Sequence, residues 1–513
     1  MLRIYLFLSL IFLTLSLEAQ EMLGMTTGTF AGTHGVLLNP SSMIGSRQYL
    51  DLQVFGIAVF EDNNYLYIPK AQYSLHNLTH KEAQMYTEEH PSPDKYTVYD
   101  WYTKIPKQVY SSEHIMTPGF MFSYENQGFA FQTQVRNILS LHNIPYHVAK
   151  FTIEGLSFTP QQHIEYTTGK FQISELSMAE MDFSYANRIY QKDYDQISIG
   201  VTAKRLRGIA GVNVLIKDAN YMAPSHDTLY VYNLDATIGL SVPLDHQTND
   251  ITINDQYFRG KGWGWDFGIY YQRNVAKTPK TKRMVPSLCG QVYQDYRYKI
   301  GVSLLDFGKI HFDQQADLLR FDNVGTFWPG IDKTKYKNID EAKHDLSNRF
   351  YGDSTAAILA HDFYMPLPTM LSLQYDQNLG GGFYLNSVFM VNLPLYPDLP
   401  YRPSQLAVIP RYDTRNFGLS MPVSLYDYNK LRLGICLRLY SFTLGTDMIS
   451  PYIRKLNFTG IDFYGSIKIS LNKGYCANKG RVKHCGNAEY LNFLRNKHHK
   501  STRHYLNIES VPQ

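Results

Sequence analysis

Histidines beside small residues are the side chains with which this chain could perform catalysis. Thr33-His34-Gly35 places a histidine next to a glycine, and His142, His147 and His163 follow near expected strand ends or loops. A hydrolase needs such a histidine within hydrogen-bonding reach of a nucleophile. The sequence pairs none of them with a serine, and no GxSxG, HExxH, Walker or GxGxxG motif stands in a supporting context. We interpret Thr33-His34-Gly35 as a turn and expect the chain not to be an enzyme.

Metal or cofactor chemistry is equally weakly encoded. The cysteines are Cys289, Cys436, Cys476 and Cys485, too few and too scattered for a disulfide framework. Cys476 and Cys485 could close a small loop or, together with His484, bind a metal, but the CxxC spacing of a zinc site is missing. We favour a disulfide or free thiols and expect no metal and no cofactor.

The triplet Gly380-Gly381-Gly382 could be read as a phosphate cradle. Such a cradle leads into a helix N-terminus, and this triplet lies between two expected strands. We therefore predict a turn.

Two arginines among aliphatic residues are more informative. In KLRLGICLRLYSF (430–442) the odd positions 431 to 439 are aliphatic, whereas Arg432 and Arg438 occupy even positions. Side chains alternate between the two faces of a strand, so one face is apolar and the other carries both cations. Lys468 stands in the same way in GIDFYGSIKISL (460–471). These three cations could hold an anionic head group; alternatively, they are solvated or paired with acids such as Asp462.

Strands of this kind recur and are about 10–12 residues long. Soluble strands average about 5–6 residues, whereas tilted strands that cross a bilayer need about 9–11. Charged residues make up 18% and aromatic residues 14% of the 513 residues, and the net charge of +4 gives no nucleic-acid footprint. We predict an all-β transmembrane outer-membrane barrel of about 14–16 antiparallel strands, with the aliphatic faces toward lipid. A large secreted sandwich or propeller is the alternative.

The N-terminus indicates export. Residues 1–19 read as a signal peptide with Arg3 in the charged region, an apolar stretch from Leu6 to Leu17 and a cleavage site at Leu17-Glu18-Ala19. We expect the cell outer membrane as the destination.

The remainder divides into three parts: residues 20–49 as an N-terminal hatch, 50–471 as the barrel and 472–513 as a basic periplasmic tail. Two long insertions, 61–115 and 305–365, fit the extracellular side. They hold helix candidates from Thr79 and in NIDEAKHDLSNRFYG (338–352), which Gly352 ends. The insertions either bind partners or cap the pore. The tail is either disordered or contacts peptidoglycan or anionic head groups.

The segment ahead of the first strand resembles a known family. Asn39-Pro40-Ser41-Ser42-Met43, preceded by Ala31-Gly32, is similar to the NPA-x-M region of FadL-type long-chain fatty acid transporters. It is more similar still to FadL-related barrels grouped under a domain of unknown function. The stretches KGWGWDFGIYYQ (261–272) and YKIGVSLLDFGKIHF (298–312) add to the resemblance, which runs from about residue 28 to 471. It implies a hatch that plugs the barrel and includes Asn39, Pro40, Ser41, Ser42 and Met43. It also implies hydrophobic ligands, in part released through a lateral opening.

Two functions follow as hypotheses. The first is an outer-membrane barrel that binds or transports small hydrophobic or amphipathic molecules, with Arg432, Arg438 and Lys468 as possible lumen ligand contacts. The second is a non-transporting scaffold for surface attachment or secretion of proteins, which would use the loops 61–115 and 305–365. We expect outer-membrane lipids, a hydrophobic ligand or a surface or secreted protein as partners, and no nucleic acid. A lipid-hydrolysing barrel is a third, weaker reading.

Overall fold

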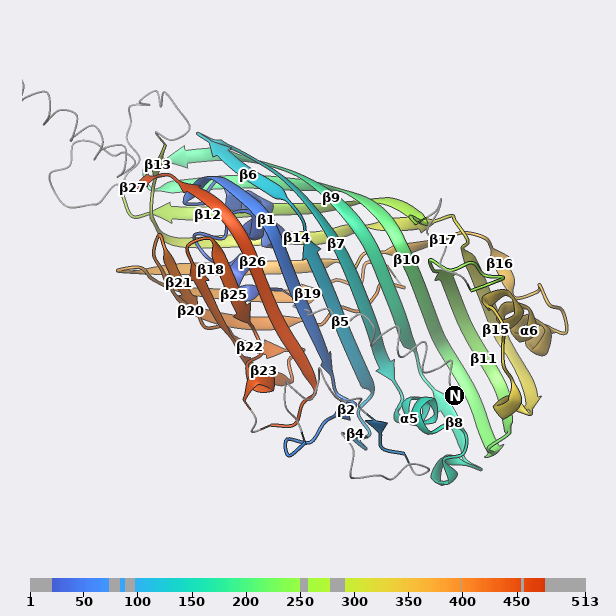
Figure 1. Ribbon diagram of the computed structural model, residues 1–513. Helices are drawn as coiled ribbons and strands as arrows, with labels where there is room; N and C mark the ends of the chain where they lie inside the picture. Colours follow the sequence, from blue (N-terminus) through green and yellow to red (C-terminus); the bar gives the residue numbers. More distant parts are fainter. Residues whose placement is uncertain are drawn as a thin grey trace, which may run out of the picture.

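The fold is a closed antiparallel β-barrel of 14 strands, elongated along its axis (Figure 1). It is described here from a computed structural model, which describes residues 21–72, 84–87, 97–249, 257–276, 291–396, 398–453 and 456–475. Closure is direct, because the first strand pairs with the last from Gln48↔Asn472 to Phe55↔Ile467. The start of the first strand and the end of the last strand therefore lie at the same end of the barrel, as an even strand count requires.

Several of the fourteen strands are interrupted into shorter pieces. The uninterrupted strands are β1 (Gln48–Asn63), β7 (Gln127–Ile144), β10 (Asp195–Ser225), β19 (Phe383–Asn392), β20 (Gln405–Asp413), β25 (Phe442–Thr446) and β26 (Gly460–Asn472). The interrupted strands are β5 (Lys107–Met116) with β6 (Gly119–Tyr124); β8 (Glu165–Thr168) with β9 (Phe171–Lys192); β11 (Thr228–Ser241) with β12 (Gly260–Asn274); β14 (Tyr296–Phe312) with β15 (Asp317–Pro329); β16 (Ile358–Ala360) with β17 (Phe363–Pro366) and β18 (Met370–Gly380); β21 (Phe417–Ser420) with β22 (Val423–Tyr426); and β23 (Lys430–Leu433) with β24 (Ile435–Leu439).

Smaller elements complete the described chain. They are α2 (Leu23–Thr26), α3 (Thr33–Leu38), η1 (Pro40–Met43), β2 (Leu66–Tyr67), β3 (Gln84–Met85), β4 (Thr97–Asp100), α5 (Tyr146–Glu154), η2 (Thr159–Gln161), β13 (Val292–Tyr293), η4 (Ile331–Lys333), α6 (Ile339–Tyr351), η5 (Ser450–Tyr452) and β27 (Gly474–Tyr475). None of the helices in the described ranges has the length and apolar character needed to cross a membrane.

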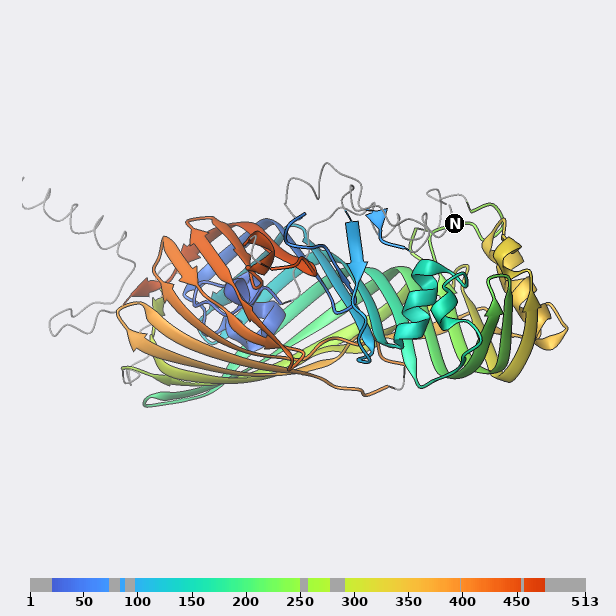
Figure 2. The ribbon, with the colours of Figure 1, turned by 90° about the horizontal axis from the view of Figure 1, so that it is seen from below.

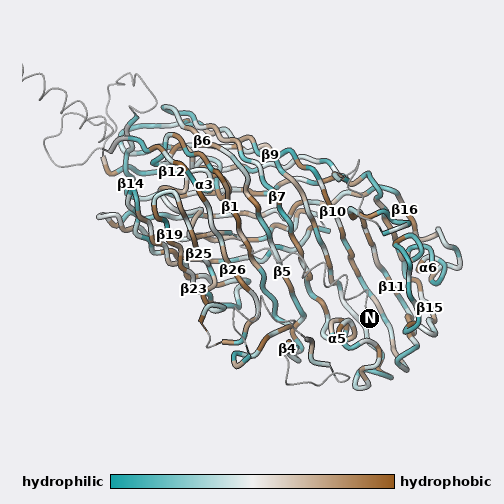
Figure 3. Tube along the Cα trace, in the orientation of Figure 1, coloured by the Kyte–Doolittle hydropathy of each residue, from teal (hydrophilic) through white to brown (hydrophobic). Residues whose placement is uncertain are grey.

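The predicted two-faced strands are confirmed. In 430–439 the aliphatic side chains are exposed, with Leu431 at 74%, while Arg432 is buried inside the barrel at 7%. In β26 the outward Ile469 and Leu471 are exposed and the inward Asp462 and Lys468 are buried. Hydrophobic and hydrophilic residues accordingly alternate along the strands (Figure 3).

Outside the barrel, the exposed apolar side chains form a belt. On β12 the outward residues Trp263, Trp265, Phe267 and Ile269 are all exposed. Tyrosines border the belt at one end, where the rings of Tyr271, Tyr298 and Tyr375 contact one another in sequence. Charged and polar side chains border the other end in a row across four strands, Arg207, Lys261, His311 and Tyr364. An apolar band between such borders is the lipid-facing surface of an outer-membrane barrel.

The structure corrects several expected boundaries. The sequence predicts strands of about 10–12 residues, but β10 runs unbroken over 31 residues. The predicted insertions 61–115 and 305–365 are too long, because these ranges include strand residues of the wall: β5, the second half of β14 and β15. The reason is that strands extended beyond the bilayer face water on their outer side and lose the apolar alternation that marks the spanning part.

Turn and cap chemistry was predicted more reliably. Gly380, Gly381 and Gly382 all have positive φ in the β18–β19 turn, as predicted. The helix expected in 338–352 is α6, whose N-cap Asn338 accepts a hydrogen bond from Glu341 N and whose end is the left-handed Gly352. The helix expected from Thr79, the signal peptide, and Cys289, Cys476, His484 and Cys485 lie outside the described residues.

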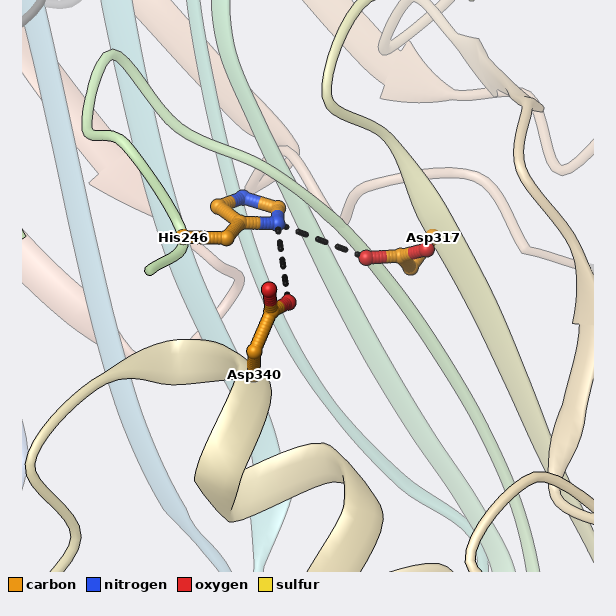
Figure 4. A group of neighbouring side chains, drawn as sticks. All are labelled: His246, Asp317 and Asp340. Carbon is orange, nitrogen blue, oxygen red and sulfur yellow. Dashed lines mark ion pairs between the residues drawn. The ribbon is translucent and has the colours of Figure 1, made fainter. Parts of the chain in front are cut away.

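The helix α6 is attached to the wall beyond the apolar belt by a group of three neighbouring side chains, His246, Asp317 and Asp340 (Figure 4). His246 Nδ1 lies 3.4 Å from an Asp317 carboxylate oxygen and 4.0 Å from Asp340. Three ligand-type side chains this close could hold a metal, but Lys343 already contacts both carboxylates. Burial would raise the pKa of Asp317, but hydrogen bonds from His246, Lys343 and His361 outweigh it and hold that pKa well below its usual range. These ion pairs therefore anchor α6 to the wall.

Candidate functional site in the barrel lumen

The N-terminal segment, residues 21–47, lies inside the barrel, near the end that carries the short turns (Figure 2). A row of small inward-facing residues across neighbouring strands makes room for it. Gly128 pairs with Ala186, Ala186 with Gly200, Gly200 with Gly268, and Gly268 with Ser303. A Cβ at Gly268 would lie 2.1 Å from Asn39 Oδ1, and one at Gly200 would lie 2.5 Å from Ser41 N. This row, the small-residue seat, lets the segment 39–43 press directly against the wall.

Asn39 connects the segment to the wall and organises its own turn. Its side chain accepts hydrogen bonds from Ser41 N at 3.0 Å and Ser41 Oγ at 2.7 Å, which caps η1 as an N-cap asparagine does. Its Nδ2 donates to Gln374 Oε1 at 3.0 Å and to the carbonyl of Val302 at 3.3 Å. Pro40 stands at the first helical position, where its missing N–H costs nothing. Pro40 therefore begins the short helix η1.

Two of the three predicted lumen cations contact this segment. Lys468 Nζ donates to the carbonyls of Phe30 and Ala31, at 3.3 and 2.6 Å, and pairs with Asp51 at 3.1 Å. The guanidinium carbon of Arg438 lies 4.6 Å from the centre of the Phe30 ring.

The remaining contacts bear on two sequence interpretations. Arg438 donates to the carbonyls of Thr414 and Arg415 and lies 3.7 Å from Asp413, so it is paired with an acid, as Lys468 is, although the acid is not Asp462. His34 is buried within α3, and its ring nitrogens have no hydrogen-bond partner among the described residues. The expected turn at Thr33-His34-Gly35 is therefore wrong: Gly32, with φ 58°, makes the turn and the helix begins at Thr33.

A buried charge cluster lies at the beginning of the segment, centred on Asp306. Arg136 approaches it with two nitrogens at 3.0 and 2.9 Å, Lys204 at 2.6 Å and Arg402 at 3.0 Å. Arg402 also contacts Glu21, the first described residue, at 2.5 Å. Two further acids complete the charge cluster: Glu180 beside Arg136 and Asp266 beside Lys204.

The backbone of Asp306 is strained in a way that serves this arrangement. Its φ is 56° in the middle of β14, where the pairing with β12 shifts register. Its N–H donates to the Asp266 carboxylate at 2.7 Å. Such bulges redirect a side chain, and here Leu305 and Asp306 are both buried inside the barrel. The broken alternation in Leu305-Asp306-Phe307 is the sequence signal that could have identified this residue.

An apolar zone fills the lumen beyond the charge cluster, toward the end of the barrel opposite the short turns. It consists of inward side chains from eight strands and two connecting segments: Phe60, Tyr110, Ile138, Leu176, Met178, Leu206, Ile310, Phe312, Ala316, Phe363, Met365, Leu367 and Tyr426. The Phe312 ring lies close against the backbone of the wall at Gly208, Gly211 and Gly260. A Cβ at any of these glycines would lie only 2.5 to 2.9 Å from the ring. The interiors of outer-membrane barrels are ordinarily polar, so an apolar stretch of lumen has the chemistry of a path or site for hydrophobic molecules.

Beside this zone the barrel wall contains a non-β seam. Among the described pairings β23 pairs only with β22, and β25 ends at Thr446, before it reaches the level of β23. The chain after β25 closes the wall instead: Ile449 N donates to Leu433 O and the Tyr452 hydroxyl donates to Asp462 O. Irregular backbone at membrane depth occurs only where protein or a cavity supports it.

Arg432 lies behind the seam. Its guanidinium carbon lies 3.4 Å from the centre of the Tyr426 ring and 4.8 Å from that of Phe60, both members of the apolar zone. It pairs with the buried Asp62 at 3.1 Å, so pairing with an acid is confirmed here too, with Asp62 in place of Asp462. Of the predicted cations, Arg432 alone contacts the apolar zone, whereas Arg438 and Lys468 contact the N-terminal segment. Sequence reasoning missed Asp306, Arg136 and Arg402 entirely.

Comparisons with known proteins identify one family and several solved structures of similar shape. The model of a family of unknown function, DUF5723, matches residues 40–447. No curated protein matches the chain in sequence.

Solved structures of similar shape include the Pseudomonas putida toluene transporter TodX, with 10% identity over 86% of this chain and 95% of that one and a TM-score of 0.38. A TodX mutant described as a monoaromatic hydrocarbon channel has 9% identity, 89% and 99% coverage and a TM-score of 0.41. A Pseudomonas aeruginosa FadL homologue has 8% identity, 88% and 98% coverage and a TM-score of 0.31. At these scores the likeness assigns no function to this chain.

Proposed function

The chain belongs to the DUF5723 family, whose function is unknown, and we propose that its barrel is an outer-membrane passage for small hydrophobic or amphipathic molecules. The observation that carries the proposal is the apolar zone, which lies inside the lumen where an ordinary barrel is polar. Its contact with Arg432 and the seam gives hydrophobic molecules a route toward the lipid. The proposal includes export by the signal peptide 1–19 to the outer membrane.

In this scheme the N-terminal segment is a hatch. It occupies the lumen between the apolar zone and the end with the short turns, held by Asn39, Lys468 and the Glu21–Arg402 pair. Polar solutes are excluded because the segment and the charge cluster fill the lumen. Arg432 would orient the polar end of an amphipathic ligand whose apolar part lies in the apolar zone, since its guanidinium faces that zone.

Binding of a hydrophobic dye tests the proposal. Purified protein in amphipol, free of detergent micelles, should bind N-phenyl-1-naphthylamine saturably, measured by fluorescence. Met178→Gln keeps the length of a fully buried side chain but introduces an amide into the apolar zone. It should weaken binding about ten-fold or more, because an unpaired buried amide costs roughly 1–3 kcal/mol.

Leu359→Gln, at an exposed position of β16, is the matched control and should bind as the wild type does. Heat-dependent gel mobility shows whether each variant is folded. Equal affinities for wild type and Met178→Gln, or no saturable binding to wild type, would refute the proposal.

One observation favours the scaffold function as a second candidate. In the extracellular sheet of β2, β4 and β3, the rings of Tyr86, Tyr99, Tyr67 and Trp101 form a continuous stacked row with centroids 4.7 to 5.8 Å apart. Aromatic side chains of this kind are enriched at protein interfaces. A protein that co-purifies with the wild type and is lost from a Tyr99→Ala/Trp101→Ala variant would support this function.

A further inference from the structure

A polar pocket lies at the end of the barrel with the short turns, beyond the N-terminal segment. Its volume is about 170 Å³, and its lining includes Ile44 and Gly45 of that segment, Asn126 of the β6–β7 turn, Arg188 of β9 and Lys473, which follows β26. Five glutamines, Gln191, Gln196, Gln272, Gln291 and Gln294, surround these residues. A lining of amides and cations matches a polar ligand rather than a hydrocarbon.

Two cations, Arg188 and Lys473, line the pocket, and neither forms an ion pair with an acid among the described residues. Arg188 donates from Nη1 to the side-chain oxygens of Asn126 and Gln191, both at 3.1 Å, while its buried Nε has no partner among the described residues. Burial, together with the charge of Arg188, lowers the pKa of Lys473 to about 7. Glu125 also lines the pocket, but it is exposed and forms no ion pair with either cation among the described residues.

We propose that this pocket binds the oxyanion head group, carboxylate or phosphate, of an amphipathic molecule at the periplasmic end of the path. The guanidinium fork of Arg188 matches such a group in two-nitrogen geometry, Lys473 adds a point charge, and the glutamine amides supply neutral donors. An oxyanion relieves the repulsion between the two half-buried cations. The inference rests on the proposed function, which it deepens by assigning the substrate class, an anionic amphiphile, and the place where the head group leaves the barrel.

Paired probes with the same chain length test the inference separately from the proposed function. Calorimetry on the full chain in amphipol compares octanoate with octanol, and inorganic phosphate serves as competitor. The double variant Arg188→Gln/Lys473→Gln should bind octanoate about ten-fold more weakly than wild type, with octanol binding unchanged. Lys192→Gln, an exposed lysine at the same end of the barrel, is the matched control for general electrostatic attraction.

The outcomes separate the two proposals. Equal binding of octanoate and octanol, unchanged in the double variant, overturns the oxyanion site and leaves the hydrophobic passage standing. Binding of neither probe to wild type refutes both. Displacement of octanoate by phosphate assigns a phosphate head group, whereas octanoate binding that phosphate does not reduce assigns a carboxylate. A measurement on wild type alone guards against misfolded variants: the carboxyl carbon resonance of labelled octanoate should shift on binding, and an unshifted resonance would overturn the site.

Discussion

At the scale of single residues, Asp306 joins three buried cations of the lumen. Its carboxylate contacts Arg136, Lys204 and Arg402 while its backbone is held at a positive φ. A non-glycine residue in this conformation costs about 1–3 kcal/mol and persists only where the surroundings compensate. Here the compensation is the pairing of three buried cations. The same residue connects the wall to Glu21 through Arg402, so the start of the N-terminal segment depends on it.

Replacing Asp306 should therefore be costly. Asp306→Asn keeps the shape but leaves three buried cations short of a negative charge, and breaking a buried ion pair typically costs about 3–5 kcal/mol. The temperature at which the heat-dependent gel shift occurs should fall clearly. Asp322→Asn, at an exposed ion pair of β15, should leave that temperature unchanged because exposed pairs contribute about 0–1 kcal/mol. Equal midpoints for the two variants would show that the charge cluster does not stabilise the barrel.

At the scale of elements, the position of the N-terminal segment is decided by its contact with β10 and β12. The small-residue seat brings backbone against backbone, so even one methyl group at Gly268 collides with Asn39. The hydrogen bonds from Asn39 to Gln374 and Val302 then fix the register of the segment on the wall. A hatch that moves during transport would have to release these contacts together.

Filling the seat should loosen the segment without unfolding the barrel. Gly268→Ala should increase hydrogen exchange of the backbone amides in 33–44, measured by mass spectrometry, while the amides of β12 stay protected. Gly465→Ala in β26 is the matched control, because its Cβ would meet the nearest atom at an ordinary 3.4 Å. Unchanged exchange in Gly268→Ala would show that the segment is held by its polar contacts alone.

At the scale of the whole molecule, the outer apolar belt decides how the barrel sits in a membrane. Val302 lies in the middle of the belt between Ile269 and Leu373 of the neighbouring strands, and all three are exposed. Beyond the row Arg207, Lys261, His311 and Tyr364, the wall continues in β11 and β15, where outward residues such as Arg320 and Asp322 are charged and exposed. The long strands therefore extend well past the lipid on the extracellular side.

A charge placed on the belt tests this arrangement. Val302→Arg should destabilise the barrel in lipid vesicles by about 2–4 kcal/mol, the usual cost of arginine at the bilayer midplane, measured by denaturant unfolding. Leu359→Arg, on an exposed residue of β16 beyond the belt, should cost less than about 1 kcal/mol. Similar losses for the two variants would contradict the assigned belt.

Alternation along the strands determined much of the architecture from the sequence alone. A period of two is a local property of the sequence. It therefore predicted the barrel class, the two faces of 430–439 and 460–471, and the inward direction of Arg432, Arg438 and Lys468. The cap at Asn338 and the glycine turn at 380–382 are local as well. The predicted strand boundaries are wrong where the strands extend beyond the lipid, because side chains that face water on the outer surface need not be apolar.

Only the tertiary structure decided which charges meet and what they hold. Asp306 and Arg136 are 170 residues apart, and Arg402 lies 381 residues from Glu21. Each inward charge looks alike in the sequence, since its partner depends on the shear and closure of the barrel. The sequence therefore placed Arg432, Arg438 and Lys468 in the lumen, whereas the fold assigned two of them to the N-terminal segment and one to the apolar zone.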